Sequence, residues 1–249
     1  AQKILDNYFV QHGGIKKLSS LNTYAEEANL EVEGGSTLVM KTFAKHQKVK
    51  RLDVYSDDKF VTSHIIFFDI SLGRSGTESK YRKVPMRQYQ PDSSALNIQD
   101  EILGLVSSKD TLVFEGSTSV NREKCFVLKH VGKKKRGLNS FGGTSNTSVV
   151  TTYYISRKRF LILRKRTYDL NLSGQVIPGF RIDYKDYEEV KGFWFPLKVL
   201  RYSDADNRLM STTLVQRVEP NKDLDDKLFR VPTEVEDEGR YRPPHSFSE

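Results

Sequence analysis

Residues 149–232 of the chain form a succession of strand-length apolar runs separated by short polar turns. The runs are rich in Tyr, Phe, Val, Ile, Leu and Thr, the residue types that favour β-strands. Successive long strands joined by tight turns make an antiparallel meander, and a meander of this length must curl, split or close around something. The pattern therefore predicts a curved antiparallel sheet, and what it curves around becomes the functional question.

The N-terminal part of the chain predicts a helix followed by more of the same sheet. Apolar residues from Ile4 to Phe9 lie on one face of a short amphipathic helix, which Gly13-Gly14 ends. A second helical turn follows to Leu21. From Thr23 the period changes to two, and Gly34-Gly35 is a hairpin signal. Further strands are predicted over residues 36–44, 48–55 and 60–68.

Three stretches interrupt this periodicity. Residues 69–94 contain Gly, Pro and much charge, and residues 132–148 are basic and rich in Gly, Ser and Asn. Both stretches are predicted to be loops. Between them, Leu96–Val106 has the apolar face of an amphipathic helix, placed to cover one mouth or face of the sheet. After residue 232 the chain is polar, and residues 233–249 are predicted to form a flexible tail.

Together these patterns predict a fold that is mainly β (α+β by element count). It is a single antiparallel, incomplete (half) β-barrel of about 10–11 strands, with an N-terminal helix and a lid helix over the concave face. Strands and helices do not alternate, which excludes a parallel α/β sheet.

The motifs of common enzymes are missing from the sequence. It has no phosphate-binding loop, dinucleotide fingerprint, HExxH or GxSxG motif, and its five histidines show no metal-ligand spacing. The single cysteine, Cys125, lies in a strand-like run and is expected to be buried. Asp183 and Asp186 leave a hydrolase conceivable, but we favour an exposed turn at Glu188–Gly192 beside a polar strand face as the explanation of the acidic cluster. We therefore predict no catalytic residue, no metal and no cofactor.

The net charge of +8 allows partners such as nucleic acid or anionic lipid. No nucleic-acid-binding motif accompanies it, so nucleic acid is not a predicted partner. The basic runs at residues 157–159 and 164–166 are interpreted as solvated loops and guarded strand ends. A basic loop is a possible contact for an anionic membrane surface: Lys133, Lys134, Lys135 and Arg136.

No apolar run is long enough to form a transmembrane helix. The chain begins at Ala1 without Met, as a mature protein does after removal of a secretory signal peptide, or as a trimmed chain does. We expect that a signal peptide was removed before Ala1 and that the protein is secreted to the periplasm.

The order of several short motifs resembles the LolA/LolB superfamily of periplasmic outer-membrane lipoprotein-sorting proteins. The resemblance covers roughly residues 3 to 232 and rests on the order of the pieces, each of which is loose. The pieces are Lys3–Gly14, Lys48–Asp53, Thr152–Leu163, Asp183–Tyr187, Val190–Pro196 and Lys227–Pro232. One departure is the turn at residues 68–73, which lacks the Trp found at the end of the corresponding turn in many relatives.

The resemblance implies one domain over residues 1–232, whose concave apolar face holds acyl chains under a lid. Arg51 would match the basic strand residue that tethers the lid. The residues expected to line the cavity and lid are Leu30, Met40, Phe67, Ile98, Ile102, Leu105, Phe126, Tyr154, Ile162 and Trp194. The predicted function is a monomeric, non-enzymatic periplasmic carrier of lipid or lipoprotein in outer-membrane lipoprotein sorting. The alternative is an envelope sensor or protein-interaction module whose cavity is filled by its own side chains.

Overall fold

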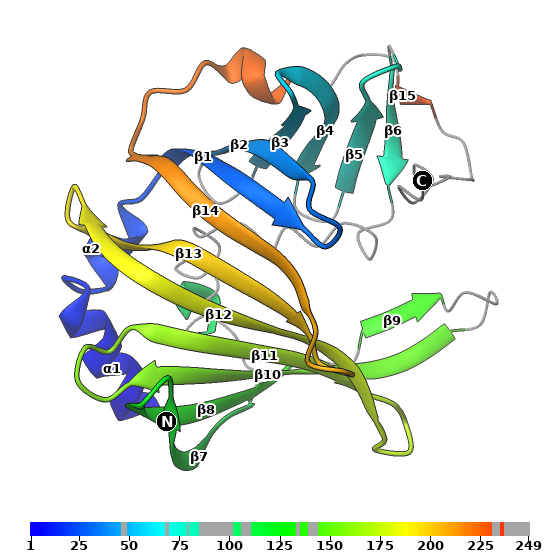
Figure 1. Ribbon diagram of the computed structural model, residues 1–249. Helices are drawn as coiled ribbons and strands as arrows, with labels where there is room; N and C mark the ends of the chain where they lie inside the picture. Colours follow the sequence, from blue (N-terminus) through cyan, green and yellow to red (C-terminus); the bar gives the residue numbers. More distant parts are fainter. Residues whose placement is uncertain are drawn as a thin grey trace. The chain divides into compact units, whose positions relative to one another are not determined.

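The computed structural model describes residues 1–45, 49–67, 70–78, 80–84, 102–105, 111–132, 135–138, 144–230 and 235–236 (Figure 1). The helical elements in this part of the chain are α1 (Gln2–Gln11), α2 (Ile15–Ser19) and the 3₁₀ helix η1 (Asp226–Phe229), together with a helical turn at 102–105. Among these described helices, none combines the length and apolar character needed to cross a membrane.

Most of the described residues are in strands. They are β1 (Thr23–Val32), β2 (Thr37–Lys45), β3 (Val49–Ser56), β4 (Lys59–Phe67), β5 (Ile70–Ser75), β6 (Tyr81–Val84), β7 (Thr111–Val120), β8 (Glu123–Val131), β9 (Lys135–Leu138), β10 (Thr144–Ser156), β11 (Ile162–Leu170), β12 (Val176–Val190), β13 (Phe193–Ser203), β14 (Leu209–Pro220) and β15 (Val235–Glu236).

The strands form one sheet with two ends. Its order is β15-β6-β5-β4-β3-β2-β1-β14-β13-β12-β11-β10-β8-β7, with β9 paired to β10 outside this path. Among the described strands the order begins and ends at different strands, so the sheet does not close on itself. Neighbouring strands such as β10 with β11, β12 with β13 and β3 with β4 pair antiparallel, whereas β15 pairs parallel with β6. This open antiparallel sheet with few helices confirms the predicted fold class, although its 15 described strands exceed the predicted 10–11.

The predicted loops were wrong where short strands pair with their neighbours. β5 and β6 lie inside the stretch 69–94, β9 and the start of β10 lie inside 132–148, and β15 lies in the predicted tail. Gly73 explains one of these errors. It is a strand residue, and a Cβ there would lie 2.6 Å from Val84 Cγ2 of β6. The glycine thus permits close strand packing, a role that sequence alone does not distinguish from a loop.

The predicted lid helix is described only in part. Residues 102–105 are helical, with Ile102 fully buried and Leu105 half-buried. The remaining residues of Leu96–Val106, including Ile98, lie outside the described residues.

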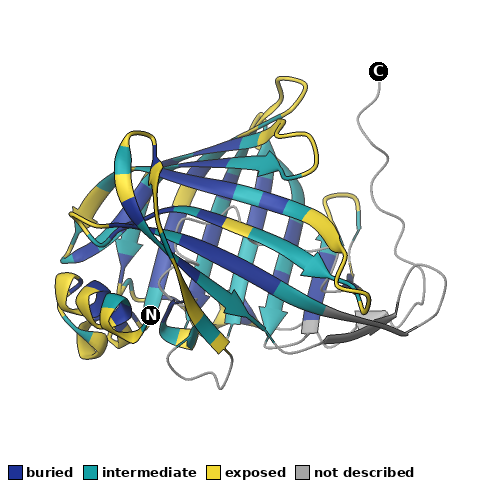
Figure 2. Ribbon diagram, turned by 90° about the horizontal axis from the view of Figure 1, so that it is seen from below, coloured by how far each residue is buried: buried dark blue, intermediate teal, exposed yellow. Residues whose placement is uncertain are grey.

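The chain divides into two compact units. Unit 1 comprises Ala1–Ser20, Glu31–Gly35 and Ala95–Leu214, and unit 2 comprises Leu21–Leu30, Ser36–Ser94 and Val215–Glu249. Unit 1 therefore contains α1, α2, β7–β13 and the first half of β14. Unit 2 contains most of β1, β2–β6, the second half of β14, η1 and β15. Figure 2 shows that buried positions recur along successive strands.

The N-terminal helix of unit 1 is amphipathic, as predicted. Leu5, Tyr8 and Phe9 are buried, and the helix ends where Gly13 and Gly14 adopt positive φ values of 81° and 91°. The amide of Gly14 donates to the carbonyl of Phe9 at 2.7 Å, which satisfies one of the terminal carbonyls. The glycine pair therefore turns the chain directly into α2.

His12 is buried at the end of α1. Its ring stacks on Tyr8 with 4.1 Å between ring centroids, and its Nε2 lies 3.4 Å from the carbonyl oxygen of Phe160. Burial lowers the pKa of His12 to about 4, although the hydrogen bond to Phe160 opposes the shift. The imidazole is therefore neutral in the folded protein at neutral pH.

This burial predicts acid sensitivity. Between pH 6.5 and 4 the unfolded chain binds a proton at His12 and the folded protein does not, so the free energy of unfolding falls as pH falls through this window. The slope from this residue is about 1.4 kcal/mol per pH unit. Urea denaturation at several pH values should show a shallower slope for His12→Gln than for the wild-type protein. His64, whose pKa burial also lowers to about 4, is retained in both proteins and cancels. Equal slopes would contradict the assignment.

Candidate functional site

The register of unit 1 places six residues in one row across the sheet. Each residue lies directly opposite the next on the neighbouring strand, and directly opposed residues share a face. From β8 to β14 the row is Leu128, Tyr153, Lys165, Ile182, Arg201 and Ser211. The first four are buried and the last two are half-buried. We call these residues the Ile182 row.

The face that carries this row is mostly apolar. Side chains two residues apart on a strand point the same way, so Phe180, Tyr184 and Val199 share the face with Ile182, and all three are buried. We call this surface of unit 1 the Ile182 face. Its two cations lie beside the same ring: Lys165 Nζ is 5.9 Å from the Phe180 centroid, and Arg201 Cζ is 4.5 Å from it.

The opposite face is dominated by arginine. Arg164 donates from Nε and Nη2 to the Asp183 carboxylate at 2.6 and 2.7 Å, and Arg181 Nε lies 3.5 Å from the same carboxylate. The guanidinium of Arg181 lies 4.0 Å from the centroid of Tyr202, and Arg166 pairs with Asp204 at 2.8 Å. We call this surface the Arg164 face.

One interpretation of charged residues therefore needs correction. The run Arg164–Arg166 was predicted to be a solvated loop or a guarded strand end, but it lies inside β11 and its middle residue, Lys165, is buried on the Ile182 face. Asp183 lies on a polar strand face, as predicted, and its side chain is only 5% exposed beneath two guanidinium groups. Its role in this network is that of a counter-ion.

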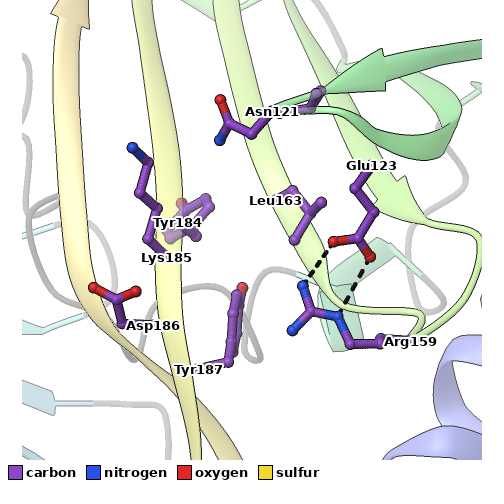
Figure 3. Close-up of a pocket in the computed structure, with 9 residues that line it drawn as sticks. Asn121, Glu123, Arg159, Leu163, Tyr184, Lys185, Asp186 and Tyr187 are labelled. Atoms are coloured by element: carbon purple, nitrogen blue, oxygen red, sulfur yellow. Dashed lines mark hydrogen bonds and ion pairs between the residues drawn. The ribbon is translucent and has the colours of Figure 1, made fainter.

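A polar hollow of about 460 Å³ lies elsewhere in unit 1 (Figure 3). It is formed by the β7–β8 turn, the β10–β11 turn, the start of β11 and the second half of β12. Its lining residues are Val120, Asn121, Glu123, Arg159, Leu163, Tyr184, Lys185, Asp186 and Tyr187. Asp183 is absent from this lining, so the proposed Asp183–Asp186 pair does not converge in this hollow.

Local backbone geometry builds the walls of the hollow. Asn121 and Arg122 have positive φ values of 49° and 68°, which the tight β7–β8 hairpin requires. Asp186 has φ 54° within β12, a left-handed conformation that Asp tolerates better than most residues. Nearby, Tyr187 is paired with Pro196, which has no amide proton to give to the ladder.

Two of the residues that line the hollow, Glu123 and Arg159, form an ion pair. Arg159 Nη2 donates to Glu123 at 2.8 Å and Nε donates at 3.3 Å, as the dashed lines in Figure 3 show. The hydrogen bonds from Arg159 lower the pKa of Glu123, and a hydrogen bond from Ser156 adds to this shift. A general acid requires the opposite shift, so this carboxylate is arranged as a structural anion.

Two further reactive groups in this part of unit 1, Cys125 and Tyr187, are also buried or hydrogen-bonded within the fold. Cys125 is fully buried, as predicted, and burial raises the pKa of its thiol. Tyr187 donates its hydroxyl to the carbonyl of Ile162 at 2.6 Å, and burial raises its pKa. No group of three or more His, Cys, Asp or Glu side chains in the described part of the chain could hold a metal ion.

The predicted cavity residues of unit 1 fall in different surroundings. Tyr154 and Trp194 pack against a buried cluster of Val120, Cys125, Leu161 and Leu163, part of which also lines the polar hollow. Ile162 and Ile102 are buried, while Leu105 and Phe126 are half-buried. Tyr153, the neighbour of Tyr154, is the tyrosine that lies in the Ile182 row. The sequence did not identify Tyr153 as a site residue, because with two consecutive tyrosines the alternating pattern does not show which one faces the core.

In unit 2 the predicted residues also divide between two faces of the sheet. Met40 is buried and lies opposite Val54, whereas Phe67 packs on the other face against Ile65, Leu72 and Tyr81. Leu30 is half-buried on β1.

Arg51 is part of a buried polar network in unit 2. Its Nε donates to both carboxylate oxygens of Asp53 at 2.9 Å, and Nη1 donates to the Leu228 carbonyl at 3.0 Å. Ser63 also donates to Asp53, at 2.6 Å, and accepts a hydrogen bond from Tyr81 at 3.0 Å. Burial alone would lower the pKa of Arg51, but Asp53 raises it overall. The predicted lid-tethering role stays a prediction.

Comparison with known proteins identifies the fold. The sequence matches no protein-family model and no curated protein. The structure resembles a DUF1329 family protein from Desulfovibrio piger, with a TM-score of 0.61 at 13% identity over 92% of this chain and 96% of that one. It also resembles a LolA superfamily protein from Nitrosomonas europaea, with a TM-score of 0.56 at 11% identity over 92% and 97% of the two chains. The chain has a LolA/LolB-like fold.

A third similar structure is an outer membrane lipoprotein-sorting protein domain from Vibrio parahaemolyticus, with a TM-score of 0.58, 10% identity and coverage of 91% and 94%. At these identities the likeness is one of fold. The likeness extends over nearly the whole chain.

The polar hollow leads to a test of its supporting contacts. Ser156 is fully buried, donates to Glu123 and accepts from the amides of Lys158 and Arg159 at 3.2 and 2.9 Å. Ser156→Ala should lower the free energy of unfolding by about 1–3 kcal/mol, because it leaves buried polar groups without this partner. Arg159→Met should cost less than about 1 kcal/mol, because the arginine side chain is 49% exposed. Urea denaturation of both variants measures the order, and the reverse order would refute this account.

Proposed function

We propose that the protein is a non-enzymatic carrier of lipid or lipoprotein in the bacterial envelope. The observation that carries the proposal is an open antiparallel sheet with a LolA/LolB-like fold and a largely buried, mostly apolar face in unit 1. Acyl chains would leave water for this face, and each buried CH₂ contributes about 0.8 kcal/mol. The mechanism is therefore sequestration.

The Ile182 face is the surface of unit 1 best suited to an acyl chain. Tyr153, Ile182 and Val199 lie on three strands of a register-aligned sheet. At 2% exposed or less they are covered in this structure, so an acyl chain would reach them by displacing the segments that cover them. The polar hollow has a charged lining and suits such a chain poorly. We place the acyl-chain site on the Ile182 face, under a lid that includes the helical residues 102–105.

The finer parts of the proposal concern place and partners. We propose a periplasmic location, a monomeric state and transfer in outer-membrane lipoprotein sorting, as the sequence motifs indicated. A basic segment would approach anionic lipid; of its residues, Lys135 and Arg136 lie on β9, whereas Lys133 and Lys134 lie outside the described residues. The strand that carries Lys135 and Arg136, β9, pairs directly with β10.

Native mass spectrometry of protein purified from its own envelope, followed by solvent extraction, tests carriage directly. We expect lipid or acylated peptide to co-purify, or to bind when offered to the delipidated protein. If nothing co-purifies and nothing binds when offered, the carrier proposal is wrong, and the interaction-module alternative takes its place.

A matched pair of substitutions tests the location of the acyl-chain site. Val199 and Leu200 are consecutive buried residues of β13, so their side chains point to opposite faces. Val199→Phe should weaken the binding of a fluorescent fatty-acid analogue about tenfold or more, because the ring occupies the apolar face. Leu200→Phe, on the Arg164 face, should leave binding near the wild-type value. Circular dichroism checks that both variants fold, since overpacking costs about 1–3 kcal/mol in either case. Equal loss of binding in both variants would place the site elsewhere.

A further inference from the structure

Two cations occupy the middle of the Ile182 row. Lys165 on β11 lies opposite Ile182 on β12, and Ile182 lies opposite Arg201 on β13. The two cations are therefore separated by one strand, and strands in a sheet are about 4.8 Å apart. Lys165 is only 5% exposed, which is rare for lysine.

The aromatic ring of Phe180 brings the two charges together. It lies one step along β12 from Ile182 on the same face, with Lys165 Nζ and Arg201 Cζ at 5.9 and 4.5 Å from its centroid. The separation of the two charged groups cannot exceed the sum of these distances. Both cations of the Ile182 row therefore lie beside one aromatic ring.

The cation pair has apolar neighbours on the β8 and β10 side of the row and along β13, whereas on the β14 side the row ends at Ser211. Leu128 and Tyr153 continue the row on the β8 and β10 side and are at most 1% exposed, and Val199 is 2% exposed on β13. An amphiphile lying on this face would meet apolar side chains along its chain and two cations at one place. Charge-assisted hydrogen bonds to a carboxylate or phosphate are stronger than those between neutral groups.

We infer that the Ile182 face selects amphiphiles with an anionic head group, which Lys165 and Arg201 bind while the acyl chain lies against the neighbouring apolar residues. This inference rests on the proposed function and specifies its ligand class. Both cations already have interactions within the folded protein. A guanidinium has five donors and an ammonium group three, so an anion can add to these contacts. The shared chemistry is an anionic oxygen on an acyl chain, whether a carboxylate or a phosphate.

The test compares ligands that share one acyl chain and differ in the head group. Palmitate and palmityl alcohol form one pair, and palmitoyl lysophosphatidylglycerol and palmitoyl lysophosphatidylcholine form the other. Their affinities are measured below the critical micelle concentration by displacement of a fluorescent fatty-alcohol probe. We expect the wild-type protein to bind the anionic member of at least one pair about tenfold or more tightly. Preference in the first pair identifies a carboxylate ligand, and preference in the second identifies a phosphate ligand.

Variants assign this preference to the two cations. The double variant Lys165→Met, Arg201→Met should lose the preference for the anionic ligand and keep its affinity for palmityl alcohol. The matched control is Lys129→Met, Arg166→Met. These two residues lie in one row of their own on the Arg164 face. The control variant should keep the preference for the anionic ligand. If the first double variant does not fold, Lys165→Gln and Arg201→Gln are measured singly, and each should lose part of the preference.

The possible outcomes separate this inference from the proposed function. Equal affinities for charged and neutral head groups in the wild-type protein, or a preference that survives in the folded Lys165→Met, Arg201→Met variant, would overturn the inference while the carrier function stands. If neither the probe nor any of the four ligands binds, both the inference and the proposed carrier function are overturned. Loss of palmityl alcohol binding together with palmitate binding would show that the two cations support the fold of the face instead of selecting the head group.

Discussion

The antiparallel register of β12 with β11 and β13 is the constraint on which the arrangement of unit 1 depends. Side chains alternate along each strand, so a slip of one residue would exchange the Ile182 face with the Arg164 face over the whole of the paired region. The side chains give this register a strong energetic preference. Ile182 is fully buried, whereas the neighbouring Asp183 holds two guanidinium groups on the other face. A slipped strand would bury those charges among apolar side chains and expose Ile182 to water.

The same constraint explains why irregular positions gather at the polar hollow. A regular ladder leaves little room between strands, so a hollow beside β12 requires a local departure from it. Asp186 with its positive φ, and Pro196 with no amide proton, lie near one another on β12 and β13. The tight turn at Asn121 supplies another wall. The polar hollow is thus a product of strand ends and turns, while the Ile182 face is a product of regular pairing.

These two origins determine how much could be predicted from the sequence. Long alternating runs specify strands, and their order predicted an open antiparallel sheet with a LolA/LolB-like fold, which the structural comparisons confirm. The short strands β5 and β6 were missed because Gly73 is also a loop signal, and only the proximity of Val84 reveals its role. Which side chains of a strand face inward was not predictable where the side chains on both faces are bulky. In Tyr153-Tyr154 either residue could face inward, and only pairing with Leu128 and Lys165 places Tyr153 in the Ile182 row.

The structural positions of charged residues were harder still to predict, because a basic run has the same sequence pattern at an exposed strand end and within a strand inside a sheet. Arg164, Lys165 and Arg166 are consecutive, and alternation sends the outer two to one face and Lys165 to the other. The distinction matters for function. An entirely apolar face can retain an acyl chain through burial of CH₂ groups, but such burial does not discriminate between head groups. Cations placed among apolar side chains add the discrimination, because a neutral head group gains nothing from them and an anionic one gains charge-assisted hydrogen bonds. Lys165 and Arg201 therefore provide a means of choosing among ligands that the apolar residues beside them lack.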